Sequence, residues 1–70
     1  MSERLLARLT KREIEVLYMV FKGKTNKQVA NDLRVSHRTV DFHLGRAYGK
    51  LGVGSRWEAY HLLAPAFASL

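Results

Sequence analysis

The residues best suited to binding chemistry share one side of a helix that the sequence predicts over about residues 37–51. Steps of three and four residues place its apolar side chains on one stripe, which comprises Val40, Leu44, Ala47, Tyr48 and Leu51. The opposite side carries Arg38, Asp41, Phe42, Gly45, Arg46 and Gly49. Such a face can contact base edges in a DNA major groove. Each glycine costs a helix about 1 kcal/mol relative to Ala, and close approach to DNA would explain that cost.

Basic residues give this region an excess of positive charge. The 70-residue chain has 12 Lys and Arg against 6 Asp and Glu, a net charge of +6, and its pI is about 10.2. This balance favours a polyanionic partner. The side chains placed to neutralise phosphates are Lys24, Lys27, Arg38, Arg46 and Lys50. For each of them the alternative is a solvated charge that serves solubility.

Four residues near the start of the 37–51 helix have both a DNA-binding and a structural interpretation. Ser36 and Thr39 can present hydroxyl groups to a phosphate at the helix N-terminus, and Ser36 also suits the N-cap. His43, one turn after Thr39, either donates to a phosphate or packs half-buried on the helix flank. Phe42 either contacts thymine methyl groups or packs against the preceding helix.

Three capping-box pairs mark helix starts: Thr10 with Glu13, Thr25 with Gln28, and Ser55 with Glu58. Together with Ser36 they predict helices over about 11–22, 26–33, 37–51 and 56–64. The first of these is apolar on nearly all sides, as expected for a helix buried among others. The sequence therefore predicts an all-α fold, a single four-helix domain spanning residues 1–70 with a core of about 9–64.

The two ends of the chain carry weaker signals. Pro65 predicts that the last helix ends near Ala64, because proline interrupts the hydrogen bonding of a helix interior. Residues 1–8 and 66–70 are expected to fray, although Phe67 and Leu70 could pack on the last helix.

The predicted helix of 56–64 carries an aromatic pair, Trp57 and Tyr60, three residues apart. These side chains either form an exposed patch that becomes a dimer interface or are buried against the helix of 11–22. Glu15 and Arg56 are expected to pair and to tie the two helices together.

Several classes of site are not expected. The chain has no Cys, so it cannot form disulfides, a zinc finger or a thiolate nucleophile. His37, His43 and His61 do not share a helix face, and we predict no metal site and no cofactor. The sequence contains no catalytic Ser-His-acid arrangement and no phosphate loop, so we predict that it is not an enzyme. It has no apolar run of about 20 residues and no signal peptide, and we expect a cytoplasmic, DNA-associated protein that does not enter membranes.

Four blocks of sequence resemble the LuxR/GerE-type DNA-binding domain. They are Leu9-Thr10-x-Arg12-Glu13-x-Glu15-Val16-Leu17, Gly23-Lys24-Thr25-Asn26-Lys27-Gln28-Val29-Ala30, Ser36-x-x-Thr39-Val40-x-x-His43-Leu44 and Lys50-Leu51-Gly52-Val53-x-Ser55-Arg56. The resemblance covers about residues 9–64, and the run from Thr39 to Leu44 is similar to the quorum-sensing branch. The chain is therefore either a stand-alone regulator or a module of a longer one.

The resemblance implies a helix-turn-helix formed by the second and third predicted helices, with the fourth as a dimerisation surface. It places base-facing positions at Asp41, Phe42 and Gly45. It places backbone-contacting positions at Lys27, Ser36, Thr39, His43 and Lys50. Family members often carry basic or amide side chains where this chain has Asp41 and Gly45. We therefore expect specificity to rest on Asp41, Phe42 and Arg46.

The predicted function is a transcriptional regulator that binds a palindromic DNA site as a homodimer, with RNA polymerase as a possible further partner. Its two recognition helices would enter successive major grooves about 10 base pairs apart. One alternative is a polymerase-associated reader resembling the last domain of sigma factors, although His43-Leu44 and the run from Lys50 to Arg56 favour the LuxR type. Another is an interaction module that sequesters a related regulator as a heterodimer.

Overall fold

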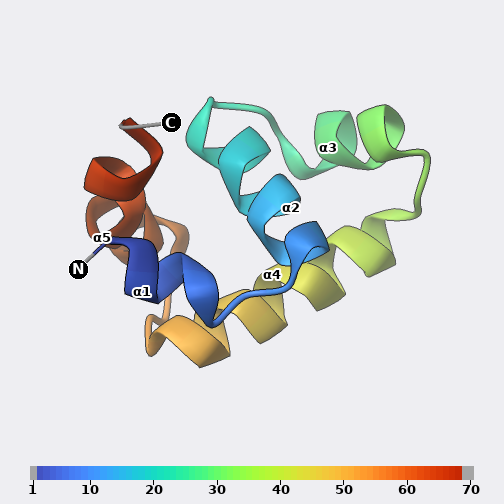
Figure 1. Ribbon diagram of the computed structural model, residues 1–70. Helices are drawn as coiled ribbons and strands as arrows, with labels where there is room; N and C mark the ends of the chain where they lie inside the picture. Colours follow the sequence, from blue (N-terminus) through green and yellow to red (C-terminus); the bar gives the residue numbers. More distant parts are fainter. Residues whose placement is uncertain (1, 69–70) are drawn as a thin grey trace.

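The computed structural model describes residues 2–68, and these form five helices joined by short loops (Figure 1). The helices are α1 (Ser2–Ala7), α2 (Lys11–Phe21), α3 (Asn26–Leu33), α4 (His37–Leu51) and α5 (Arg56–Ala68). The all-α prediction is confirmed. The predicted bounds of α3 and α4 agree with the structure, and α2 ends one residue earlier than expected.

Local capping explains where α2, α3 and α4 begin. In the first capping box the Thr10 amide donates to Glu13 Oε1 at 2.9 Å, and the Glu13 amide donates to Thr10 Oγ1 at 3.1 Å. Thr25 and Gln28 repeat this exchange at 2.8 and 3.1 Å. Ser36 Oγ accepts from the Thr39 amide at 3.1 Å. Side chains thus satisfy amides that the first turn of each helix leaves without a partner.

The turn between α3 and α4 is tight. It contains Arg34 in the left-handed conformation, at φ 57° and ψ 44°. The Val35 amide donates to the carbonyl of Ala30 at 3.0 Å and closes the end of α3. This turn fixes the angle at which α4 leaves α3.

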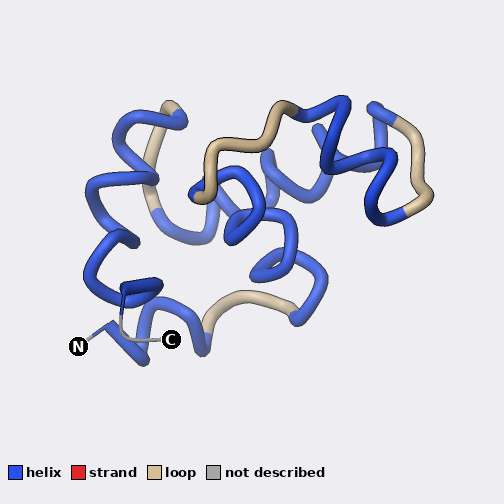
Figure 2. Tube along the Cα trace, turned by 90° about the horizontal axis from the view of Figure 1, so that it is seen from above, coloured by secondary structure: helices blue, strands red, loops and turns tan. Residues whose placement is uncertain are grey.

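The core lies where α2 passes between α3, α4 and α5 (Figures 1 and 2). Its buried side chains come from these four helices and from the segment before α2: Leu9, Val16, Leu17, Val29, Ala30, Val40, Leu44, Ala47, Leu63 and Phe67. The prediction that the first capped helix, α2, is the central core element is confirmed.

The prediction of four helices was one too few, because residues 2–7 form α1 instead of fraying. Half-buried Leu5 and Leu6 pack against the core, and α1 lies against α5 (Figure 1). Burial of these side chains stabilises a helix too short to form alone.

The prediction that the last helix ends near Ala64 was also wrong, because α5 continues through Pro65 to Ala68. Ala66 and Phe67 are 3% and 4% exposed, and the Phe67 ring contacts the rings of Tyr18 and Phe21, with centroids 5.3 Å apart in both pairs. This packing offsets the local cost of the proline. Leu70 lies outside the described residues.

Candidate nucleic-acid interface

One side of α4 is exposed along the helix, and we call it the α4 face. It consists of Arg38, Asp41, Phe42, Gly45, Arg46 and Gly49, all of which are exposed. The opposite stripe is buried in the core, with Val40 and Ala47 fully buried and Leu44 6% exposed. The predicted division of the helix into two sides is therefore present in the structure.

Phe42 is 58% exposed, which excludes the interpretation that it packs in the core. Its ring lies beneath the Arg46 guanidinium, 5.7 Å from the centroid. The His43 ring meets it edge-on, also with 5.7 Å between centroids. These contacts leave much of an apolar ring facing outward between polar neighbours, where a DNA base could contact it.

Gly45 and Gly49 stand in open space on the same face. A Cβ atom at either position would meet no heavy atom within 4 Å. The fold itself therefore does not require glycine at these positions, although each glycine weakens the helix by about 1 kcal/mol. Internal packing therefore does not explain the presence of glycine here.

Asp41 belongs to a series of hydrogen-bonded side chains that connects three helices, α3, α4 and α5. Its Oδ1 accepts from Asn26 Nδ2 at 3.0 Å, and Asn26 Oδ1 accepts from Arg56 Nη2 at 2.6 Å. The expected pairing of Arg56 with Glu15 was wrong, because Glu15 lies 3.7 Å from Arg12, its neighbour on α2.

Glu13 is 2% exposed and lies beneath the C-terminal half of α4. Lys50 Nζ donates to its two oxygens at 2.8 and 3.2 Å, and Arg46 Nε lies 3.9 Å away. Burial alone would raise the pKa of Glu13. The hydrogen bond from Lys50, that from the Thr10 amide and the Lys50 charge outweigh burial, so the pKa lies below its ordinary value of 4.5.

The basic residues predicted to contact phosphates differ in their exposure and in whether an acidic side chain already pairs with them. Lys27 and Arg38 are exposed, and the Arg46 side chain is 58% exposed despite its approach to Glu13. Lys24 pairs with Asp32 at the surface. The Lys50 charge is compensated by buried Glu13 within the fold. Sequence reasoning missed this ion pair, since the two residues are 37 positions apart.

Ser36, Thr39 and His43 follow one another along the first half of α4. Besides capping the helix, Ser36 shares a hydrogen bond of 3.0 Å with the Thr39 hydroxyl. Ser36 is exposed, whereas Thr39 and His43 are half-buried. Capping and phosphate contact remain compatible for Ser36, because a hydroxyl oxygen carries both a proton and lone pairs.

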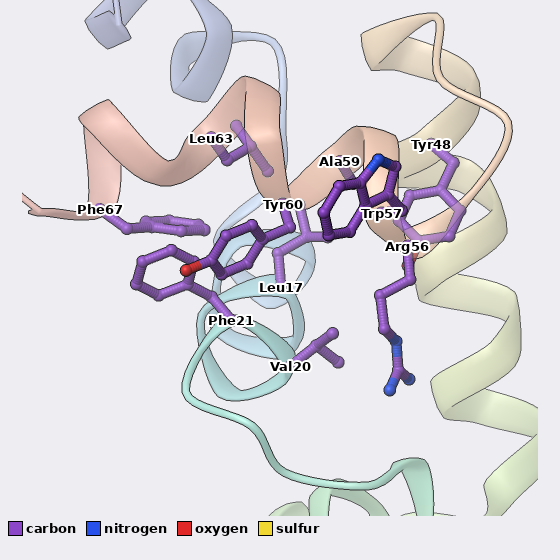
Figure 3. Close-up of a pocket in the computed structure, with 10 residues that line it drawn as sticks. All are labelled: Leu17, Val20, Phe21, Tyr48, Arg56, Trp57, Ala59, Tyr60, Leu63 and Phe67. Carbon is purple, nitrogen blue, oxygen red and sulfur yellow. The ribbon is translucent and has the colours of Figure 1, made fainter.

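A second exposed surface lies on α5, and we call Trp57, Tyr60 and His61 the α5 aromatic face. Trp57 is 71% exposed, so the burial interpretation was wrong for this residue. Tyr60 is 46% exposed and stacks on Phe21 of α2 at 5.1 Å. Trp57 and Tyr60 border an apolar pocket of about 460 Å³ between α2, α4 and α5 (Figure 3).

Among residues 2–68, no three His, Asp or Glu side chains are grouped so that they could hold a metal ion. None of the helices in this part of the chain is long and apolar enough to cross a membrane.

Residues 7–63 match the family described as bacterial regulatory proteins, luxR family. The chain belongs to the luxR family. Members of this family are DNA-binding regulators and not enzymes, in agreement with the prediction from the sequence. The match favours a LuxR-type domain over the sigma-factor alternative.

Two relatives illustrate the similarity. The transcriptional regulatory protein TdiR of Thauera aromatica is 41% identical over 59 residues, which cover 84% of this chain and 26% of TdiR. The HTH-type transcriptional regulator MalT of Yersinia pestis is 45% identical over 51 residues, which cover 73% of this chain and 6% of MalT. The chain thus spans only a minor part of either relative. No solved structure matches it significantly.

Proposed function

We propose that this luxR-family domain binds double-stranded DNA sequence-specifically by placing α4 in a major groove and thereby regulates transcription. The observation that carries the proposal is the α4 face, which is exposed along its length and combines Phe42 with glycines that no internal contact requires. Both relatives are named as transcriptional regulators, which supports the regulatory role.

Each group on the α4 face suits a different part of a base pair. Asp41 can accept a hydrogen bond from cytosine N4, and Phe42 can contact a thymine methyl group. Arg38 and Arg46 can reach guanine or a phosphate. Gly45, with no side chain, allows the helix to approach the groove closely.

The phosphate contacts are assigned to residues around this face. Lys27, Ser36 and Thr39 lie at the N-terminal ends of α3 and α4, where amides and positive charge favour anions. His43 lies one turn after Thr39 on the flank of α4 and can donate to a phosphate. Lys24 can contribute if DNA competes with its surface pairing to Asp32. Lys50 is better explained as the partner of Glu13, so we assign it no main role in phosphate binding.

We further propose that α5 supports pairing of two copies on an imperfect palindrome. Exposed Trp57, half-exposed Tyr60 and the adjacent pocket offer apolar surface to a second copy. An interface formed by one helix is small, so the free domain is expected to be mostly monomeric and to pair on DNA. This would place two α4 helices about 10 base pairs apart, in a cytoplasmic protein associated with the nucleoid.

Selection of bound duplexes from a random DNA pool tests the proposal. The protein should enrich one motif with two related half-sites. Binding to the selected duplex should weaken with salt at a log–log slope of about −4 to −5, for roughly five neutralised phosphates. An unenriched pool together with a slope shallower than about −1 would contradict DNA reading.

The same α5 aromatic face favours a second candidate, an interaction module that sequesters a related regulator. This candidate predicts weak binding to every duplex and tight binding to a full-length relative. Measuring both affinities with one preparation separates the two functions.

A further inference from the structure

We propose that Asn26 is a positioning residue that sets how Asp41 meets a base pair, and that Arg56 holds Asn26 in place. This inference rests on the proposed reading function of α4. It adds two residues to the specificity apparatus, one on α3 and one on α5, neither of which lies on the α4 face.

The geometry of the two hydrogen bonds leaves one orientation for the Asn26 amide. Arg56 can only donate and the ionised Asp41 carboxylate can only accept. The amide oxygen must therefore face Arg56, at 2.6 Å, and the amide nitrogen must face Asp41, at 3.0 Å. Because both ends of the amide are used, rotation of the Asn26 side chain would break two bonds at once.

This arrangement leaves Asp41 able to bind DNA. Asn26 engages only Oδ1 of the carboxylate, and a carboxylate has acceptor sites on both oxygens. Oδ2 can therefore accept from cytosine N4 while Oδ1 keeps its partner. An acceptor that is already held loses less side-chain freedom on binding than a free one.

The surface exposure of these three side chains indicates that their hydrogen bonds orient Asp41 more than they stabilise the fold. Asp41 and Arg56 are exposed and Asn26 is half-buried, and exposed polar pairs contribute little to stability. Arg56 extends away from the Trp57 and Tyr60 rings (Figure 3). As the first residue of α5, it connects the start of that helix to Asn26 and, through Asn26, to Asp41.

The test compares base preferences selected from a random DNA pool by the protein and its variants. Asp41→Ala should reduce discrimination at one base pair by roughly 5- to 150-fold, the range of one good base contact. Asn26→Ala should reduce discrimination at that same pair by about 2- to 12-fold, the range for one immobilised side chain. In the Asp41→Ala background, Asn26→Ala should produce no further change.

Three controls make the result specific. Asn31→Ala removes an exposed asparagine from the same helix and should leave the base preference unchanged. Arg56→Ala should reduce discrimination at the same base pair, but less than Asn26→Ala does. Arg56→Lys retains a charged donor and should keep most of the discrimination of the unmodified protein. The thermal midpoint should change little in every variant, since the residues lie at the surface.

The outcomes separate this inference from the function on which it rests. If the unmodified protein enriches no motif, the proposed function fails and the inference fails with it. If a motif is enriched and depends on Asp41, but Asn26→Ala leaves the preference intact, only the inference is overturned. A uniform loss of affinity for all sequences in Asn26→Ala would also overturn it, because that result indicates a direct phosphate contact.

Discussion

The α4 face and the α5 aromatic face both expose a large aromatic ring, yet their surroundings differ in chemistry. Phe42 lies among two arginines, an aspartate and glycines, with a guanidinium over its ring. Trp57 borders an apolar pocket and meets the His61 ring edge-on at 4.1 Å. The first setting suits a polyanion with apolar methyl groups at its base edges, and the second suits another protein surface. The side chains around an exposed aromatic ring thus indicate which kind of partner the ring can contact.

The two faces also differ in how the core supports them. Glu13 lies beneath α4 and contacts both Lys50 and Arg46, so the α4 face rests on a buried charge. The α5 aromatic face rests on ring contacts, chiefly between Tyr60 and Phe21. Removing the buried charge of Glu13 should therefore weaken the support of the α4 face. Changing the ring packing between Tyr60 and Phe21 should weaken the support of the α5 aromatic face.

The largest expected effect follows from Glu13→Gln. This change preserves size but removes the negative charge that faces Lys50, and it should lower the free energy of unfolding by about 1.5 to 3 kcal/mol, the value of a hydrogen bond to a charged group. Denaturant titration measures it. Glu15→Gln, which affects only a surface pair on the same helix, is the matched control and should change stability little.

Acid should reproduce the loss of the Glu13 contact. The pKa of Glu13 is lowered in the folded state, so its contribution is present above the unfolded pKa and is lost as pH falls through the folded pKa. Below about pH 4.5, Glu13→Gln should therefore be less sensitive to pH than the unmodified protein. Equal slopes of stability against pH in the two proteins would contradict the assignment.

Asp41→Ala tests the α4 face without touching the core. Removing a negative charge should strengthen binding to random DNA, and losing an acceptor should relax preference at one base pair by about 1 to 3 kcal/mol. Competition assays with duplexes substituted at each position measure both effects. Unchanged affinity together with unchanged preference would show that this face does not read DNA as proposed.

Trp57→Glu tests the other side of the comparison. It should weaken cooperative pairing on a two-site duplex while leaving binding to a single half-site and the circular dichroism spectrum intact, because Trp57 is 71% exposed. Gel-shift titrations of the two duplexes make the comparison. Loss of helical signal would instead assign the residue a core role.

Gly45→Ala should have opposite effects on stability and on DNA binding. Open space around Gly45 means that Ala should stabilise α4 by about 1 kcal/mol. The added methyl group should nevertheless weaken binding to the selected duplex. A more stable variant with undiminished affinity would indicate that the glycine is not needed for approach to DNA.

Sequence reasoning succeeded where the signal is local. The starts of α2, α3 and α4 follow from residues three positions apart, such as Thr10 and Glu13. It failed at Pro65 because a local breaker was outweighed by tertiary burial of Phe67. It also missed the partners of Asn26 and Lys50, since hydrogen bonds between residues 15 to 37 positions apart leave no periodic pattern.

Backbone amide shifts measured during titration of the labelled protein with the selected half-site duplex test the central claim most directly. We expect the largest changes along residues 36–49, smaller changes near Lys27 and little change at Trp57 and Tyr60. Largest changes on α5, with α4 unaffected, would contradict the claim that the α4 face reads DNA.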